Sequence, residues 1–539
     1  MKYIFISGGV ISGIGKGIAT ASIALLLKSA GFKVVPLKMD PYLNVDAGTM
    51  NPVEHGEVFV LDDGTETDQD LGHYERFLGS SLNRNSIATQ GSIYLSVIQR
   101  ERNLEYGGEC VDVVNSITGE IIDRINLAGR SRGVDVVVIE IGGTTGEYQN
   151  MLFLEANRLL KLKKPEDVIH IHVTYLPIPS FLGEMKSKPA QMSVRDLNGV
   201  GIQPDIILAR AERPLDEARV KKLALSTGLE AEDVISAPDV SNVYKVPINF
   251  EEGNLTSRIL KKLKLRRKNK DLKEWRAYVK KVENSKVPVK IGIVGKYFST
   301  GDFTLSDSYI SVIEAIKHAS YNQNLKPEIS WIESGKILGN IDQLKQYQGV
   351  IVPGGFGSRD IEGKIAAIKY CRENKIPYFG LCYGMQLACV EYARNILGMD
   401  GAHTTEIDPE TKYPIIHIMP DQEKKLLDKD YGGTMRLGAW DCVLSPGSVV
   451  RSLYGKTQIS ERHRHRYEFN NNYLANFKKN GFKIVGTSPN GKLVEVIEIE
   501  DHPFFVGTQF HPELKSRPLE PHPLFTGFIK AAADIVLSS

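Results

Sequence analysis

The chain has 539 residues, more than one hydrophobic core usually supports, so we expect two or more domains. Its 67 basic and 65 acidic residues give a net charge of +2, which argues against a general nucleic-acid-binding protein and leaves any basic site local. Five cysteines, an odd number without a Cys-x-x-Cys pair, are typical of a reduced, cytoplasmic protein. We expect neither a signal peptide nor a membrane span, because no charged leader precedes the first strand and no apolar run reaches the roughly 18 residues that a span needs.

The chain opens with a strand expected over residues 3–6, a glycine-rich loop over residues 7–17 and a helix over residues 18–30. The glycines let backbone N–H groups turn toward an anion, the helix adds the positive end of its dipole, and Lys16 adds a full charge. The pattern predicts a phosphate-binding loop, and the alternative is a tight turn without a ligand. Gly17 stands where a Walker motif has serine or threonine, so we expect carboxylates elsewhere to hold magnesium.

Residues 32–37 read as a second strand and complete a β-α-β unit. The strand leads into Lys38 and Asp40, at the sheet edge where open parallel sheets bind ligands. Lys38 is therefore a candidate second phosphate contact. The polar stretch over residues 42–76 is expected to be irregular, and a long irregular acidic stretch is more often functional than neutral.

A β-branched run over residues 134–139 predicts a strand that is covered on both faces, and Glu140 follows it. Glu140 therefore belongs at the same sheet edge as the phosphate loop. We assign Asp70 and Glu140 to magnesium. The alternative is that such acids only solvate the edge or cap the next helix.

Further strands are expected over residues 168–173 and 205–209. His170 and His172 alternate onto one face of the first of these strands. We expect ordinary buried or half-buried histidines, because no third metal ligand follows at a useful spacing.

Two basic segments have more than one interpretation. Lys186 and Lys188 lie in a loop expected over residues 183–191, where they can clamp a triphosphate or simply be surface charge. The densest basic run, residues 261–270, begins where the first α/β pattern stops. Because no aromatic residues interleave with its charges, we predict a solvated linker helix rather than a nucleic-acid patch.

Strands expected over residues 289–294 and 349–352 restart the α/β pattern, so two parallel-sheet domains are in series. Residues 376–386 then read as a strand, a Gly-x-Cys-x-Gly corner at Cys382, and a helix. This is the pattern of a nucleophile elbow with cysteine in place of serine. The helix N-terminus favours the reactive thiolate, whereas the alternative is a structural buried cysteine.

A base for this cysteine is found near the end of the chain. In an extended segment His511 and Glu513 point the same way, so Glu513 is expected to orient the His511 imidazole. Gly354 and Gly355 can present N–H groups to an oxyanion. Cysteine, histidine and glutamate beside a diglycine loop predict acyl transfer from an amide.

These motifs resemble two known families. Those of a class I glutamine amidotransferase domain are matched by residues 353–357, 380–386 and 509–513. Those of the CTP synthase family are matched by residues 7–12, 38–42, 55–60, 70–76 and 186–189. The resemblance covers nearly the whole chain and implies an α/β fold with two parallel-sheet domains: a dethiobiotin-synthetase-like synthase domain over residues 1–265, a linker over residues 266–288 and a glutaminase domain over residues 289–539.

The resemblance also implies a reaction. ATP would phosphorylate O4 of UTP, and ammonia, free or released from glutamine, would displace the phosphate to give CTP for pyrimidine nucleotide synthesis. Mg²⁺ would be the metal, GTP an activator and CTP an inhibitor. The assembly would be a homotetramer without nucleic-acid or membrane partners.

Site residues follow from the resemblance position by position. Catalysis is assigned to Cys382, His511 and Glu513. ATP is assigned to Gly13, Ile14, Gly15, Lys16, Gly17, Ile18, Lys38 and Asp70, and the metal to Asp70 and Glu140. UTP and CTP are assigned to Ser12, Glu147, Tyr148, Gln149, Lys186, Ser187, Lys188, Pro189, Ala190, Gln191 and Lys222. Glutamine is assigned to Gly355, Leu381, Tyr383, Gly384, Met385, Gln386, Glu406 and Arg466. Residues 432–438 resemble a lid associated with GTP activation.

The chain departs from the family pattern in two places. Gly13 stands where the family usually has a second serine. In the loop over residues 142–149, Glu147 replaces a shorter acid and Gln149 replaces a glutamate. Because this loop distinguishes CTP from UTP in the family, we predict weaker inhibition by CTP than in relatives with both acids. Losing a charge-assisted hydrogen bond to a buried partner costs roughly ten- to hundredfold in affinity.

Two other functions stay open. A cobyrinate-type amidotransferase also joins such a domain to a glutaminase, but its acceptor is a carboxylate and residues 186–189 would lack a triphosphate. A catalytically idle nucleotide-binding scaffold that polymerises would not need Cys382, His511, Glu513 and Lys16 together.

Overall fold

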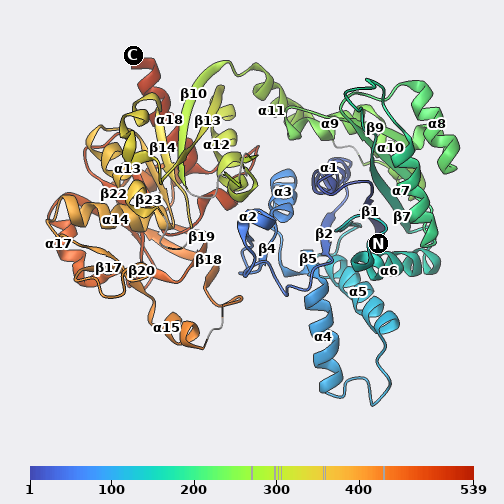
Figure 1. Ribbon diagram of the computed structural model, residues 1–539, viewed down its shortest axis with the longest axis horizontal. Coiled ribbons are helices and arrows are strands. Elements are labelled where there is room, and N and C mark those ends of the chain that lie inside the picture. The colour runs from blue at the N-terminus through green and yellow to red at the C-terminus, as the bar shows by residue number, and fades with distance from the viewer. Residues whose placement is uncertain are drawn as a thin grey trace. The chain divides into compact units, whose positions relative to one another are not determined.

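The computed structural model describes the chain except residues 269, 270, 296–298, 301, 302, 305, 356, 358, 359, 429, 430 and 539. Three positions of the predicted motifs, Phe356, Asn269 and Lys270, lie outside the described residues. The chain forms two compact units (Figure 1). Unit 1 comprises Met1–Asp46 and Asp70–Val279, and unit 2 comprises Ala47–Gln69 and Lys280–Ser539.

The core of unit 1 is a seven-stranded parallel sheet with the strand order β5-β2-β6-β1-β7-β8-β9. Its strands are β1 (Lys2–Gly8), β2 (Val34–Asp40), β5 (Ile87–Thr89), β6 (Val136–Ile141), β7 (Val168–Tyr175), β8 (Ile206–Ala211) and β9 (Val234–Pro238). Every residue of β6 is buried, as expected of a strand that helices cover on both faces. The loops after β1, β2 and β6 therefore meet at one edge of the sheet.

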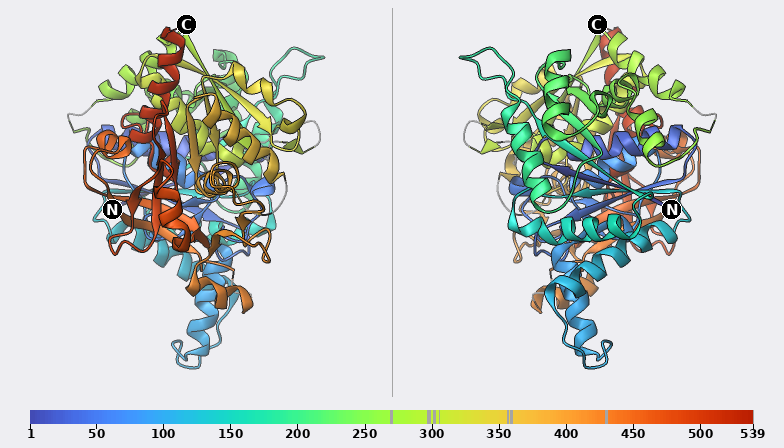
Figure 2. Two further views of the ribbon diagram at one scale, coloured as in Figure 1. Left: turned by 90° about the vertical axis from the view of Figure 1, so that its left-hand side faces the viewer. Right: turned by 90° about the vertical axis from the view of Figure 1, so that its right-hand side faces the viewer.

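The helices of unit 1 pack on both faces of this sheet. They are α1 (Lys16–Ser29), α3 (Gln69–Leu78), α4 (Gln90–Arg102), α5 (Val113–Arg130), α6 (Met151–Lys163), α7 (Lys188–Gly199), α8 (Glu217–Thr227), α9 (Val246–Glu252), α10 (Leu255–Lys262) and the start of α11 (Lys273–Asn284). Helix α1 packs with α9 and α10, whereas α5 packs with α6 and α7 with α8. Right-handed crossovers place α1 on the face opposite α5 to α8, because β1 and β2 connect in the reverse direction across the sheet. Helices α4 and α5 extend away from the sheet (Figure 2).

The helix expected over residues 261–270 is wrong. Helix α10 ends at Lys262, and Lys264 takes a left-handed conformation with a φ of 55°. The N–H of Leu265 then donates to the carbonyl of Leu260 at 2.9 Å, which closes the helix end and leaves Leu263 fully buried. Charge density alone could not predict the turn that buries this leucine.

Two stretches expected to be loops contain regular structure. Residues 42–76 include α2 (Pro52–His55), the hairpin of β3 (Phe59–Val60) and β4 (Glu66–Thr67), and most of α3. Lys188 begins helix α7, and Pro189 follows in its first turn, where a missing N–H is tolerated.

Unit 2 contains a nine-stranded sheet with the order β13-β10-β14-β15-β23-β22-β21-β18-β19. The first five of these strands are parallel, and the others pair antiparallel. The sheet is formed by β10 (Val287–Gly295), β13 (Leu325–Glu333), β14 (Gly349–Val352), β15 (Tyr378–Leu381), β18 (Arg436–Leu444), β19 (Gln458–His465), β21 (Phe482–Thr487), β22 (Val494–Ile499) and β23 (Phe505–Thr508). Smaller sheets are formed by β11 (Ser299–Thr300) with β12 (Phe303–Thr304), and by β16 (His403–Thr404), β17 (Pro414–Ile418) and β20 (Tyr467–Phe469).

Helices pack on both faces of the large sheet, over two apolar clusters. The helices of unit 2 are α2, α12 (Ile310–Asn322), α13 (Ile361–Glu373), α14 (Tyr383–Asn395), α15 (Pro420–Leu427), α16 (Val449–Tyr454), α17 (Leu474–Lys478) and α18 (Pro523–Ser538). Helix α13 packs on α14, and α12 packs on α18.

The predicted fold class, two α/β units with parallel sheets in series, is confirmed. The boundaries at residues 265 and 288 stay a prediction, and the structure adds that Ala47–Gln69 packs with unit 2. Within the described part of the chain, no helix has the length and apolar character needed to cross a membrane.

Candidate active sites

The phosphate loop of unit 1 joins β1 to α1. Gly15 caps the helix with a φ of 89°, and α1 begins at Lys16. The Lys16 Nζ donates to the carbonyl of Gly143 at 2.7 Å, in the loop after β6. Burial lowers the pKa of Lys16, and the charge of Glu140 opposes this shift. The loop, the helix start and the lysine thus meet at the carboxyl edge of the sheet.

Lys38 lies at the centre of a buried cluster of carboxylates. Its Nζ lies 2.5 Å from Asp70 Oδ2, 2.8 Å from Glu140 Oε1 and 3.5 Å from Asp40 Oδ1. Burial alone would raise the pKa of Asp70, but the charges of Lys38 and His73 and the hydrogen bond from Lys38 together lower it. Burial and the charge of Asp70 raise the pKa of Glu140, whose Oε2 accepts a hydrogen bond from Tyr74. The two carboxylates assigned to magnesium therefore converge on one ammonium group.

The glycine that departs from the Walker pattern makes room for one of these carboxylates. A Cβ atom at Gly17 would lie only 1.9 Å from Asp70 Oδ1. The Asp70 carboxylate therefore occupies the space that a serine or threonine side chain would take. The sequence predicted a substitute carboxylate, and the structure brings Asp70 to the position that lacks the hydroxyl.

The residues of this cluster fit a magnesium ion. Carboxylate oxygens are ligands that Mg²⁺ prefers, and it usually takes one or two from protein and the rest from water and phosphate. Asp40 Oδ2 is buried and has no hydrogen-bond partner among the described residues. Across the part of the chain that the structure describes, no group of three or more His, Cys, Asp or Glu side chains is arranged to hold a metal by itself. A metal here would need ligands from its substrate as well as Asp70 and Glu140.

The loop after β6 carries the altered residues. The N–H of Thr145 donates to the carbonyl of Gly8 at 2.7 Å, which ties this loop to the end of β1. Gln149 is exposed, and its Nε2 donates to Glu147 Oε2 at 3.3 Å. Tyr148 is 98% exposed, and Ser12 is also exposed at the phosphate loop. The Gln149 side chain is thus open to solvent in this structure, and its role toward CTP stays a prediction.

The residues assigned to the triphosphate come from two elements around Glu184. Lys186 Nζ donates to Glu184 Oε2 at 2.7 Å, and this bond lowers the pKa of Glu184, with a smaller contribution from Lys222 on α8. Lys222 is thus near Lys186, although no sequence spacing connects the two. Gln191 Nε2 donates to Ser187 Oγ at 3.2 Å within the first turn of α7, which also contains Lys188, Pro189 and Ala190.

The predicted burial of His170 and His172 is confirmed, since neither side chain is exposed. Ser7 Oγ lies 2.8 Å from His170 Nε2 and 2.9 Å from His172 Nδ1. Burial lowers the pKa of His172 to about 3. Both histidines belong to the packed interior beneath the phosphate loop.

In unit 2 the nucleophile elbow is formed by the end of β15, Cys382 and the start of α14. Cys382 has a φ of 49° and a ψ of −98°, a strained conformation for a residue with a side chain. A Cβ atom at Gly384 would lie 2.1 Å from the carbonyl of Val352, so this glycine lets α14 approach β14 closely. The predicted corner is present with its cysteine at the tip.

His511 and Glu513 form a hydrogen-bonded ion pair. His511 Nδ1 donates to Glu513 Oε1 at 2.6 Å. The expectation of an extended segment is wrong, because Pro512–Lys515 forms a 3-10 turn that brings the two side chains together. Burial alone would lower the pKa of His511, but the charges of Glu513 and Cys382 hold it well above its ordinary value. This charge arrangement favours the protonated imidazolium form of His511.

A pocket of about 600 Å³ brings these groups together. Its lining includes Gly354, Gly355, Cys382, Glu406, Arg466, Tyr467, His511 and Glu513. A Cβ atom at Gly354 would lie 2.8 Å from His511 Cε1 and 3.7 Å from Cys382 Cβ, so the diglycine turn lies against the catalytic pair. The other residues assigned to glutamine, Leu381, Tyr383, Gly384, Met385 and Gln386, are buried in the elbow.

Arg466 connects the pocket to the loop that resembles a lid. Its Nη2 donates to the carbonyl of Tyr431 at 2.8 Å and to Thr434 Oγ1 at 2.9 Å. Its Nη1 donates to Gln422 Oε1 at 2.8 Å. On the other side of the pocket, Glu406 Oε1 accepts a hydrogen bond from the Gly357 N–H at 2.8 Å.

A segment from the first half of the sequence completes this pocket, which sequence reasoning did not predict. Gly48, Thr49, Met50, Pro52, Glu57 and Val58 also line it. Arg462 Nε donates to Asp62 Oδ1 at 2.6 Å, and Arg464 Nε donates to Glu66 Oε1 at 2.8 Å. Both arginines are on β19. The Arg462 carbonyl accepts from the His511 N–H at 2.8 Å, and the Arg464 carbonyl lies 3.8 Å from Cys382 Sγ. The acidic residues of this segment are the sequence signal, but their partners are about 400 residues away.

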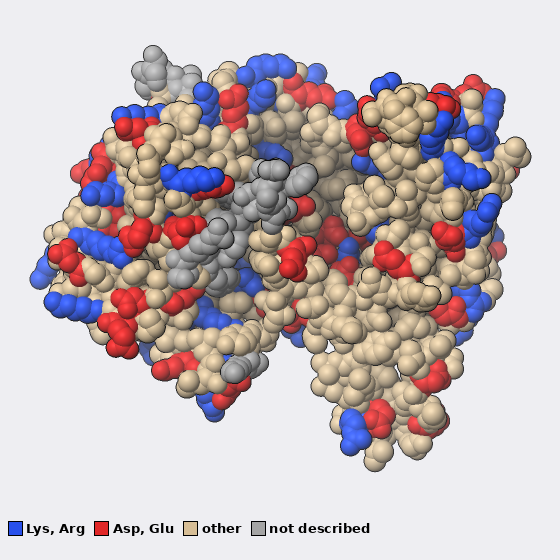
Figure 3. Space-filling model, viewed as in Figure 1, with Lys and Arg blue, Asp and Glu red and all other residues tan. Residues whose placement is uncertain are grey.

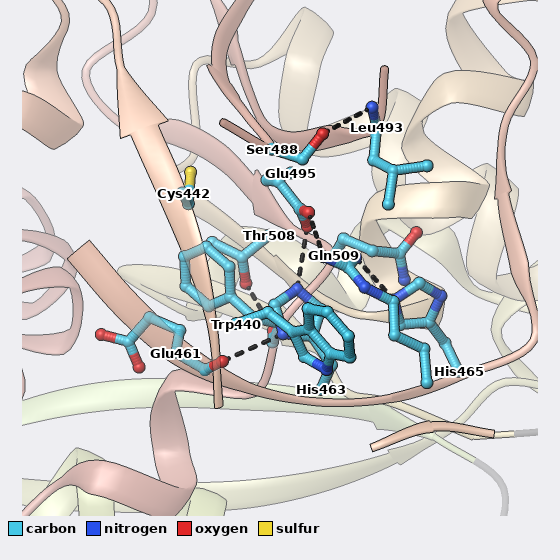
Figure 4. A network of polar contacts seen from close by, with 12 residues as sticks. Trp440, Cys442, Glu461, His463, His465, Ser488, Leu493, Glu495, Thr508 and Gln509 are labelled. Carbon is cyan, nitrogen blue, oxygen red and sulfur yellow. Dashed lines mark hydrogen bonds and ion pairs between the residues drawn. The ribbon is translucent and has the colours of Figure 1, made fainter. Parts of the chain in front are cut away.

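A buried polar network connects neighbouring strands of the large sheet (Figure 4). Glu495 Oε1 accepts a hydrogen bond from Arg436 Nη2 at 2.7 Å, and its Oε2 lies 2.9 Å from His463 Nε2. Burial alone would raise the pKa of Glu495, but the charges of His463 and Arg436 lower it to about 2. The ionised carboxylate therefore ties β18, β19 and β22 together beneath the catalytic pair.

Comparison with known proteins gives matches over nearly the whole chain. The family model described as CTP synthase N-terminus matches residues 2–265, and that described as glutamine amidotransferase class-I matches residues 304–531. A CTP synthase of Halalkalibacterium halodurans is 49% identical over 534 residues, which cover 98% of this chain and 99% of the relative. A CTP synthase of Clostridium acetobutylicum is 49% identical over 537 residues, 99% of each chain. A solved glutaminase domain of Trypanosoma brucei CTPS with bound acivicin is 35% identical, covers 46% of this chain and 94% of its own, and has a TM-score of 0.42.

Proposed function

The chain belongs to the CTP synthase family, and from this premise we propose how its two sites divide the reaction. The protein is a ligase that converts UTP to CTP with nitrogen from glutamine. We assign glutamine cleavage to unit 2 and the amination of UTP, with ATP, to unit 1. The observation that carries this division is the pocket in which Cys382 lies with the His511–Glu513 pair, while Lys16 and Lys38 belong to unit 1.

In unit 2, Cys382 attacks the carboxamide carbon of glutamine as a thiolate. His511 accepts the thiol proton and returns it to the leaving ammonia, and Glu513 holds the imidazole through its 2.6 Å hydrogen bond. The N–H groups of the Gly354–Gly355 turn are suited to stabilise the oxyanion. Water then hydrolyses the thioester to glutamate. Gly355, Glu406 and Arg466 are the proposed contacts for the glutamine backbone.

In unit 1, the γ-phosphoryl group of ATP is transferred to O4 of UTP, and ammonia then displaces phosphate at C4. The phosphate loop positions the triphosphate of ATP, and Lys16 and Lys38 neutralise charge on the transferred group. Asp70 and Glu140 would hold Mg²⁺, which supplies further positive charge to the phosphates when bound. Lys186, Lys188 and Lys222 are the proposed contacts for the triphosphate of UTP.

The regulation and assembly are also proposals. GTP would act through residues 432–438, because Arg466 is hydrogen-bonded to this loop and also lines the glutamine pocket. CTP would compete through the UTP phosphate site, with Glu147 and Gln149 beside its ring. Exposed apolar side chains on α4 and α5, including Leu95, Ile98, Val113 and Val114, support a homotetramer interface. Figure 3 shows few charged side chains along this arm except at its tip. Five free cysteines support a cytoplasmic location.

An assay of CTP formation tests the proposal. The purified chain is incubated with UTP, ATP and Mg²⁺, and CTP is followed by its ultraviolet absorbance with either glutamine or ammonium as the donor. We expect CTP with both donors and stimulation by GTP with glutamine alone. Failure to form CTP with either donor would overturn the proposal, and amidation of a carboxylate acceptor would favour a cobyrinate-type enzyme instead.

A further inference from the structure

The sulfur of Cys382 has a hydrogen-bond donor that the assigned catalytic residues do not include. Gln509 Nε2 donates to Cys382 Sγ at 3.6 Å. The Gln509 side chain is only 1% exposed, so water does not compete for this donor. The Cys382 thiol itself faces the carbonyl of Arg464 at 3.8 Å, which can accept from S–H but cannot stabilise a thiolate.

The orientation of the Gln509 amide is fixed by a second glutamine. Gln386 Nε2 donates to Gln509 Oε1 at 3.2 Å and to the carbonyl of Tyr467 at 2.9 Å. If the Gln509 amide were reversed, its NH₂ group would face the Gln386 donor and its oxygen would face the sulfur. The observed arrangement therefore keeps an N–H group on the sulfur. Gln386 is buried in the elbow, and the residues that line the pocket do not include it.

The backbone of Gln509 is also held firmly. Its N–H donates to the carbonyl of Glu495 at 2.8 Å, and the Cys382 N–H donates to the carbonyl of Thr508, the preceding residue, at 2.6 Å. Figure 4 shows Gln509 beside Glu495, whose carboxylate is bonded to Arg436 and His463. The buried network thus fixes the strand that presents the amide to the nucleophile.

We propose that Gln509 is a further catalytic residue, which donates an N–H···S hydrogen bond to the Cys382 thiolate, and that Gln386 positions it. When the thiol proton passes to His511, the bond becomes charge-assisted and roughly doubles in strength. When the sulfur bonds to the glutamine carbonyl carbon, its negative charge moves to the carbonyl oxygen and the bond weakens again. The inference rests on the proposed role of Cys382, and it adds a donor that raises the fraction of Cys382 present as the attacking thiolate.

Substitution of Gln509 by methionine tests this inference, because methionine is also unbranched but lacks the donor. Alkylation of Cys382 by iodoacetamide is followed against pH by mass spectrometry of its peptide, with the exposed Cys110 as an internal reference. For Gln509→Met we expect the Cys382 midpoint to move to higher pH. Glutamine-dependent kcat should fall roughly ten- to hundredfold while KM for glutamine changes little. Ammonia-dependent synthesis should stay at the wild-type rate.

Two further variants keep the result interpretable. Gln386→Met should also move the midpoint of Cys382 alkylation to higher pH, by a smaller amount than Gln509→Met. If Gln509→Met loses ammonia-dependent activity as well, the shift in Gln386→Met tests the inference instead. Gln323→Met, whose amide bonds the carbonyls of Ala319 and Thr526 away from the pocket, should behave as wild type. An unchanged Cys382 midpoint and kcat in the Gln509 variant would overturn the inference. Glutamine-dependent synthesis in Cys382→Ala would instead overturn the proposed function.

Discussion

The two sites use the same structural device for opposite purposes. Each lies at a corner where a parallel strand turns into a helix, after β1 in unit 1 and after β15 in unit 2. The first corner is open: Gly15 and Gly17 carry no side chains, and the Asp70 carboxylate lies in the adjacent space, beside which we propose that a phosphate of ATP binds. The second is filled by Cys382 in a strained conformation. In the proposed reaction, one corner binds an anion of its substrate, whereas the other forms an anion from its own side chain.

The sites also differ in how far along the chain their parts are separated. In unit 1 the phosphate loop, Lys38, Asp70 and Glu140 meet at one sheet edge and lie within about 140 residues of chain. Lys38 and Glu140 are near the ends of β2 and β6, and Asp70 is in the first turn of α3. In unit 2 the pocket that contains the elbow and the His511–Glu513 pair is also lined by residues of the segment Ala47–Gln69. The hydrolytic pocket is thus completed by a segment that precedes Asp70 directly in the sequence.

The largest effect is expected for Lys16→Ala, which removes the fixed charge from the open corner. CTP formation should fall at least about hundredfold with both glutamine and ammonia, because the transferred phosphoryl group loses a preorganised donor. The ultraviolet assay with each donor measures this loss. Lys33→Ala, an exposed lysine nearby in sequence, is the matched control. Wild-type ammonia activity in Lys16→Ala would show that the ATP site is misplaced.

Gly17→Ser restores the hydroxyl of a Walker motif and should nevertheless harm the enzyme. The new Cβ would collide with Asp70, and such overpacking costs roughly ten- to hundredfold in activity with either donor. Gly17→Ala introduces the same collision without the hydroxyl and should give a similar loss. If the serine variant matches wild type in a titration of CTP formation against ATP, Asp70 does not substitute for the hydroxyl.

The nucleotide corner shows what the sequence can predict. Four glycines before Lys16, and acids at strand ends, identified the phosphate loop and the carboxylates of the sheet edge. The elbow was equally visible, because strand, corner and helix are consecutive. The close approach of Asp70 to Gly17 was not predictable, since it depends on how α3 approaches α1. The contacts of Arg462 and Arg464 with Asp62 and Glu66 join residues about 400 apart and leave no spacing signal. Lys222 could be assigned only through the resemblance.

Glu66→Gln tests whether the segment Ala47–Gln69, which lines the pocket, contributes to glutamine cleavage at Cys382. The variant leaves the half-buried Arg464 charge without its anionic partner, so the strand that carries Arg464 should be held less firmly. We expect glutamine-dependent kcat/KM to fall roughly tenfold, with ammonia-dependent synthesis spared. Steady-state rates with both donors measure the split. Glu54→Gln, exposed on the same segment, serves as the control, and equal loss with both donors would indicate general destabilisation instead.

The smallest effect is expected for Gln149→Glu in the loop after β6. Because Gln149 is exposed, the added charge should tighten inhibition by CTP only about two- to fivefold, less than a buried position would give. KM for UTP should change little. Inhibition curves of the two proteins at fixed UTP decide the point, and superimposable curves would remove Gln149 from the CTP site.

The central claim is that two corners carry separable chemistry, and Cys382→Ala tests it most directly. CTP formation by this variant is measured with glutamine and, separately, with ammonium at the same UTP, ATP and Mg²⁺ concentrations. The account predicts that synthesis from glutamine is abolished while synthesis from ammonium stays close to the wild-type rate. Equal loss with both donors, or retained synthesis from glutamine, would contradict it.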